Sequence, residues 1–209
     1  MFIFDYLMLL LANLHNYDNL INAILGSEMA NLLRTLILIM VSSVLLTAAK
    51  ALGYDLVELS HIHLAITVFI YTIFAQAFVM FYFIGVARLV NNIQMILNSE
   101  TNLAELFEEA PDDLTPYRKK VDRFVHEADL CKRQTIPWTM LMLILGMIGF
   151  LLGGAHDTGL VDKTTHSGVV YGFIASMIIG FFRQWYYLGK SHTLLRKVKG
   201  LFEIPDGQM

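Results

Sequence analysis

Histidine is the residue type of this sequence best suited to chemistry, because four of the seven histidines flank long apolar stretches on one predicted side of a membrane. Neutral imidazole binds zinc, copper and haem iron well. The four are His61, His63, His156 and His166, and Asp157 adjoins one of them. These residues are therefore the candidate ligands of a metal ion or a cofactor.

Two kinds of site are open to these side chains, beside a simpler interpretation. A b-type haem needs two imidazoles from facing helices, and His63 with His166 is the candidate pair, with His61 and His156 as alternatives. A copper or zinc ion would take three or four ligands from His61, His63, His156 and His166, with Asp157 as a ligand or an orienting group. The sequence favours the simpler interpretation, in which the imidazoles are solvated or bonded to turn carbonyls.

No other pattern points to catalysis. The sequence has no Walker loop, dinucleotide fingerprint, HExxH or CxxC motif, so it predicts no catalytic residue and an enzyme is disfavoured. A net charge of −3 gives no basic field for nucleic acid. The apolar stretches contain no acidic residue, which argues against a proton-coupled transporter. Gln76 needs a partner in hydrocarbon, and we expect an interhelical hydrogen bond rather than a quinol or substrate contact.

The composition places these residues on membrane helices. Of 209 residues, 56% are hydrophobic and 16% are charged, whereas soluble domains carry about 25% charged residues. About 20 apolar residues cross a bilayer as a helix, and four stretches reach that length. They are residues 32–52, 62–86, 137–155 and 167–188. The sequence thus predicts an all-α integral membrane protein with four transmembrane helices.

The basic residues predict the orientation. Of 15 Lys and Arg residues, 13 lie outside the turns between the first and second and between the third and fourth stretches. Because basic residues concentrate on the cytoplasmic side, both termini are expected there, in a membrane of the bacterial inner type. Trp138 and Trp185 fall at the cytoplasmic ends of their stretches, where amphipathic rings suit the headgroup level. The four candidate histidines then face outward.

The two halves of the chain resemble each other. LLTAAKALG at residues 45–53 and LLGGAHDTG at 151–159 share their Leu-Leu start, central Ala and final Gly, 106 residues apart. FYFIG at 81–85 and WYYLG at 185–189 also correspond. We interpret this as two tandem-repeated hairpins that form a four-helix bundle. Small residues are expected to let the helices approach closely; they include Gly146, Gly149 and Gly153 on the third stretch and Gly168, Gly172, Ser176 and Gly180 on the fourth.

The predicted organisation has five parts. Residues 1–29 form an amphipathic N-terminal segment that docks on protein, 30–90 the first hairpin, 91–136 a helical cytoplasmic arm, 137–190 the second hairpin and 191–209 a cytoplasmic tail. Thr115 followed by Pro116 predicts a helix start in the arm, with Thr115 as its N-cap. Lone Cys131 receives no role.

These features favour a non-catalytic scaffold or accessory subunit of a larger membrane assembly, respiratory or redox assemblies included. The expected partners are the lipid bilayer and other membrane subunits, or further copies of the chain. A metal- or haem-binding membrane protein and a small-solute channel or carrier are the alternatives.

Overall fold

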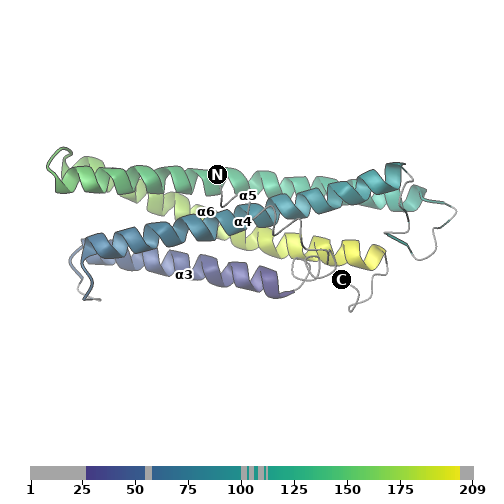
Figure 1. Ribbon diagram of the computed structural model, residues 1–209, viewed down its shortest axis with the longest axis horizontal. Coiled ribbons are helices and arrows are strands. Elements are labelled where there is room, and N and C mark those ends of the chain that lie inside the picture. The colour runs from purple at the N-terminus through teal and green to yellow at the C-terminus, as the bar shows by residue number, and fades with distance from the viewer. Residues whose placement is uncertain are drawn as a thin grey trace, which may run out of the picture.

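The computed structural model describes residues 27–54, 58–99, 103, 106–107, 111 and 113–202, which form four long helices (Figure 1). These are α3 (Ser27–Ala51), α4 (His61–Ser99), α5 (Thr115–Asp157) and α6 (Lys163–Leu201). Each helix is long and apolar enough to cross a membrane, with windows of mean hydropathy between 1.4 and 2.1. The predicted all-helical class is confirmed for the described residues. The predicted N-terminal segment lies almost entirely outside them.

The helices lie side by side in an elongated bundle (Figure 1). We call the end where short connections join α3 to α4 and α5 to α6 the turn end, and the opposite end the arm end. α5 packs most extensively against α6 and α4, whereas α3 packs on α4 and α6. α3 is much shorter than the other helices and covers only the part of the bundle toward the turn end.

Two glycines end α3 and α5 in the same way. Gly53 has a φ of 94° and Gly159 a φ of 78°, a conformation that other residues rarely adopt. The amide of the following residue donates to Ala49 O in one turn and to Ala155 O in the other, as in a Schellman cap. Each glycine amide also donates to the carbonyl three residues before it. These equivalent bonds are 106 residues apart, the same offset as the sequence match.

The predicted arm is built from continuations of the membrane-length helices. α4 runs on to Ser99, and α5 is one helix from Thr115 to Asp157 with Pro137 inside it. The helix starts at Thr115 as predicted, but Thr115 is not its N-cap: Leu114 occupies that position without a capping side chain. Instead, the Thr115 amide donates to Asp113 Oδ1 at 2.9 Å.

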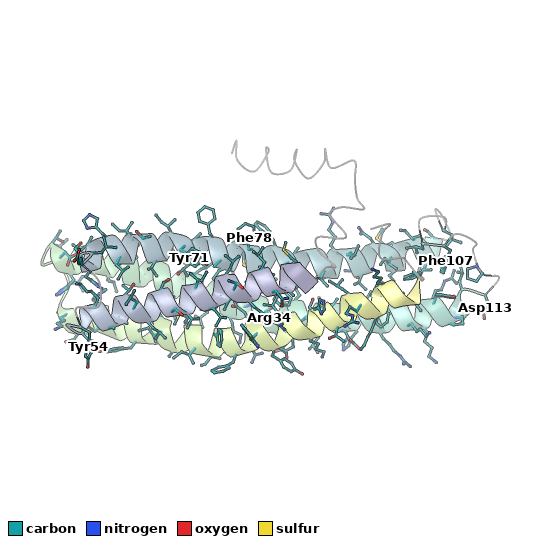
Figure 2. All side chains as sticks on the ribbon, turned by 90° about the horizontal axis from the view of Figure 1, so that it is seen from below. Arg34, Tyr54, Tyr71, Phe78, Phe107 and Asp113 are labelled. Atoms are coloured by element: carbon teal, nitrogen blue, oxygen red, sulfur yellow. The ribbon has the colours of Figure 1, made fainter. Side chains whose placement is uncertain are left out.

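Apolar contacts and ring stacking hold the arm end together. Val121 and Ala128 of α5 are buried in the same core as Val90 and Leu97 of α4. Three rings meet beyond them, with centroid separations of 5.0–6.1 Å; they belong to Phe107, Tyr117 and Phe202. Phe107 lies at this end of the molecule in Figure 2. The cluster therefore ties the α4–α5 connection to the end of α6.

The glycines of α5 and α6 have different surroundings. Gly146, Gly149 and Gly153 all lie against α6 side chains, so they let these two helices approach, as predicted. The fourth-helix stripe does not keep one face. A strict four-residue spacing turns by about 40° per step around an α-helix, so the stripe winds around α6. Gly180 is buried against Met142, whereas Gly168 and Gly172 face open space.

Candidate functional site

Three of the four candidate histidines gather at the turn end. The rings of His156, at the end of α5, and His166, at the start of α6, stack with centroids 6.0 Å apart and planes 10° apart. His61, in the first turn of α4, lies close enough to interact electrostatically with His166. A Cβ on Gly153 would lie 3.3 Å from the His166 ring, so the absence of a side chain at Gly153 lets this ring pack against α5. We call His61, His156 and His166 the histidine cluster.

His63 is outside the histidine cluster. Two residues along a helix differ by about 200° in direction, so His61 and His63 cannot share a face. His63 is exposed, and its Nδ1 lies 2.6 Å from Ser60 Oγ in a local hydrogen bond. Asp157 is exposed as well. Within the described ranges, no group of three or more His, Cys, Asp or Glu side chains is arranged to hold a metal ion.

The histidine cluster has few hydrogen-bond partners. His156 Nδ1 lies 3.0 Å from Val161 O, and because a carbonyl oxygen only accepts, this nitrogen is the donor of the bond. The Nδ1 atoms of His61 and His166 are buried without a partner in the structure. For His156, the partner is a turn carbonyl, which is one of the two kinds of partner that the simpler interpretation names, the other being water.

A second polar group lies deep in the bundle, where α4, α5 and α6 meet. Gln184 Nε2 donates to Gln76 Oε1 at 2.6 Å and to Thr139 Oγ1 at 2.9 Å. Gln76 Nε2 in turn donates to Met40 Sδ of α3 at 3.0 Å. All three polar side chains are fully buried. We call Gln76, Thr139 and Gln184 the glutamine cluster; it joins the two halves of the chain by hydrogen bonds.

The glutamine cluster agrees with the expected interhelical bond for Gln76, but sequence reasoning missed its partners. Gln184 is an uncharged polar residue within the fourth apolar stretch, as Gln76 is within the second, and that shared feature was the signal available in the sequence. Gln184 Oε1 itself has no partner in the structure. Both protons of the Gln184 amide are used, whereas its oxygen is available as an acceptor.

A third polar contact lies toward the arm end. Arg183 Nε donates to Gln134 O at 3.1 Å, and its Nη2 donates to Gln134 Oε1. The guanidinium lies 5.6 Å from the centroid of the Trp138 ring. Gln134 stands three residues before Pro137, which cannot donate a backbone hydrogen bond. The carbonyl that Pro137 leaves without its helical donor is that of Arg133, four residues before it, so the Arg183 bonds join α6 to α5 next to the proline without replacing the missing bond.

No protein-family model matches this chain, and neither the curated proteins nor the solved structures contain a match.

Proposed function

We propose that this chain is a non-catalytic integral membrane scaffold or accessory subunit of a larger membrane assembly. The exposed large apolar side chains support membrane insertion. Phe74, Leu151 and Phe182 are each more than 60% exposed. This apolar surface ends toward the arm end at one residue on each helix, with Met95 as an exception beyond it. The four residues are Leu32, Ile84, Met140 and Tyr186. Such a continuous apolar surface suits hydrocarbon, since soluble monomers rarely expose one of this extent.

The observation that carries the scaffold proposal is an exposed seam on α6. Gly168, Gly172 and Ala175 are exposed, and a Cβ on either glycine would contact nothing in the chain. Ile179, Phe182 and Tyr186 continue the same seam at alternating spacings of four and three residues. That spacing keeps residues on one side of a helix, and small residues at the contact let another helix approach closely. A helix of another subunit fits this seam.

The interior polar groups support a structural role. Buried Gln76, Thr139 and Gln184 are bonded to one another, and Tyr71 donates its hydroxyl to Leu36 O at 3.1 Å. These contacts join helices to one another, which is what a structural role requires. In the proposed orientation the arm end and both termini are cytoplasmic, which follows the distribution of Lys and Arg. The equivalent caps at Gly53 and Gly159 support a duplicated hairpin.

The seam can be tested by substituting Gly172 with leucine. The added side chain meets open space within the chain, so the bundle should fold, while close approach by another helix is blocked. We expect Gly172→Leu to lose the higher-mass species that wild type shows after crosslinking in membranes and mild-detergent purification. Gly154→Leu is the matched control, because Gly154 is another exposed helical glycine with open space around it.

The readout also separates the versions of this proposal. Mass spectrometry of the crosslinked species distinguishes a homo-oligomer from a complex with other subunits. Wild type that stays a monomer in membranes under crosslinking would contradict the scaffold function. Chain that is released from membranes by alkaline carbonate would contradict insertion, and cysteines at positions 61 or 166 labelled solely from the cytosol would reverse the orientation.

A further inference from the structure

We propose that Arg34, together with His192 and Arg196, binds the phosphate of an anionic membrane lipid at the arm end of the apolar surface. This inference rests on the membrane insertion proposed above. It does not require the scaffold role. The three side chains come from α3 and α6, whose contact places them together.

The guanidinium of Arg34 is held against α6 by a ring and a glycine. It lies 5.2 Å from the centroid of Trp185, within the range of a cation–π contact. Its Nη2 would lie 3.1 Å from a Cβ on Gly189, so the absence of a side chain there makes room for the group. Arg34 Nε is buried and has no hydrogen-bond partner in the structure. A planar group held in this way is prepared to bind an anion through its remaining donors.

Further positive charge converges on the same place. Trp185, Gly189, His192 and Arg196 follow one another at spacings of four, three and four residues, which keeps them on one face of α6. Arg34 and Arg196 both lie near enough for their charges to act on the His192 imidazole, and no described carboxylate is among the groups that do so. Arg34 forms no ion pair with the described residues. An anion between Arg34 and Arg196 would offset the repulsion between the two guanidinium groups, and the His192 imidazole can donate a ring N–H to it.

The position along the bundle points to a lipid phosphate. Arg34 is two residues from Leu32, where the exposed apolar surface of α3 begins, and Trp185 adjoins Tyr186, where that of α6 ends. The site is therefore at the level of the headgroups. Figure 2 places Arg34 on α3, beside α6.

The test measures binding of phosphatidylglycerol and phosphatidylcholine to the full chain in detergent micelles, by native mass spectrometry and thermal unfolding. We expect wild type to prefer phosphatidylglycerol. A basic residue near an anionic lipid surface contributes about 1 kcal/mol, so Arg34→Gln should weaken phosphatidylglycerol binding about fivefold. Arg196→Gln, at an exposed position, should act in the same direction without a folding defect. Arg88→Gln is the matched control, since Arg88 is an exposed arginine of α4 near the same level.

Gly189→Leu tests the geometry without changing any charge. The new side chain would displace the Arg34 guanidinium, so phosphatidylglycerol binding should again fall. An unchanged lipid preference in both Arg34→Gln and Arg196→Gln would overturn the proposal. Millimolar inorganic phosphate that competes fully with the lipid would assign the site to free phosphate instead. A chain that stays monodisperse without detergent would contradict insertion itself, which distinguishes that failure from loss of the lipid site.

Discussion

The two polar clusters of this bundle differ in depth, and depth decides how their side chains are satisfied. In the glutamine cluster, three fully buried side chains from three helices bond directly to one another. In the histidine cluster, at the turn end, the rings stack and one nitrogen lies near a local turn carbonyl. A buried amide that loses its partner is costly, whereas the Nδ1 atoms of His61 and His166 are already buried without a partner, so replacing either ring breaks no hydrogen bond through that atom. We therefore expect substitutions in the glutamine cluster to lower the free energy of unfolding, and substitutions in the histidine cluster to change it little.

The largest expected effect follows from removing one member of the glutamine cluster. Gln184→Leu leaves Gln76 and Thr139 without this donor, and we expect a loss of about 1–2 kcal/mol in the free energy of unfolding. Gln76→Leu should cost a similar amount. The double variant should lose less than the sum, with a coupling of about 1 kcal/mol. Equilibrium unfolding in micelles measures all four forms, and strictly additive losses would contradict the direct bond.

Thr139 gives a smaller effect on the same cluster. Thr139→Val keeps the shape of the side chain but removes the hydroxyl that accepts from Gln184 Nε2. We expect a loss of about 1 kcal/mol by the same unfolding measurement. Thr193→Val is the matched control, because exposed Thr193 bonds only to its own helix at Gly189 O. Equal losses in the two variants would show that the interhelical bond contributes nothing.

The difference between the clusters also explains what the sequence could predict. The four helices follow from long apolar stretches, and the sequence match marks Gly53 and Gly159 as equivalent positions, although their role as caps was not predicted. The need of Gln76 for a partner follows from its place in a stretch, but its partner Gln184 lies 108 residues away, and pairing at that distance depends on the rotation of each helix. The same rotation divides the α6 glycines between core and surface. That the histidines meet at helix ends follows from the turns alone, but which of them meet depends on the same rotation, and His63 of the candidate pair is outside the histidine cluster.

The histidine cluster should tolerate substitution. His166→Phe preserves a ring over Gly153, and we expect a change in unfolding free energy within about 0.5 kcal/mol. Elemental analysis and a visible spectrum of purified wild type give the chemical counterpart, and we expect no stoichiometric zinc, copper or haem. A Soret band, or one metal per chain that is lost in His63→Ala and His166→Ala, would instead show that the turn end binds a haem or a metal ion. The histidines would then be the functional group of the molecule, and they would not tolerate substitution.

The smallest effect concerns pH at the same end, where Asp162 caps α6. Its Oδ2 accepts from the Thr165 amide at 3.0 Å and its Oδ1 accepts from the Thr165 hydroxyl at 2.6 Å. These bonds hold the pKa of Asp162 below its usual value. The cap therefore contributes fully above the ordinary Asp pKa of about 3.9, and the contribution is lost as the pH falls through the lower folded-state pKa.

Asparagine at position 162 separates the charge from the cap. Its side-chain oxygen can still accept the Thr165 amide but cannot be protonated, so Asp162→Asn should lose less stability than wild type between pH 5 and pH 3. Thermal unfolding across that range measures the difference. Asp157→Asn removes a carboxylate at the same end without touching the cap, and it should follow wild type. If Asp162→Asn instead loses as much stability as wild type over this range, protonation of Asp162 is not the cause of the loss. The capping bonds at this helix end would then contribute nothing that depends on the charge of the carboxylate.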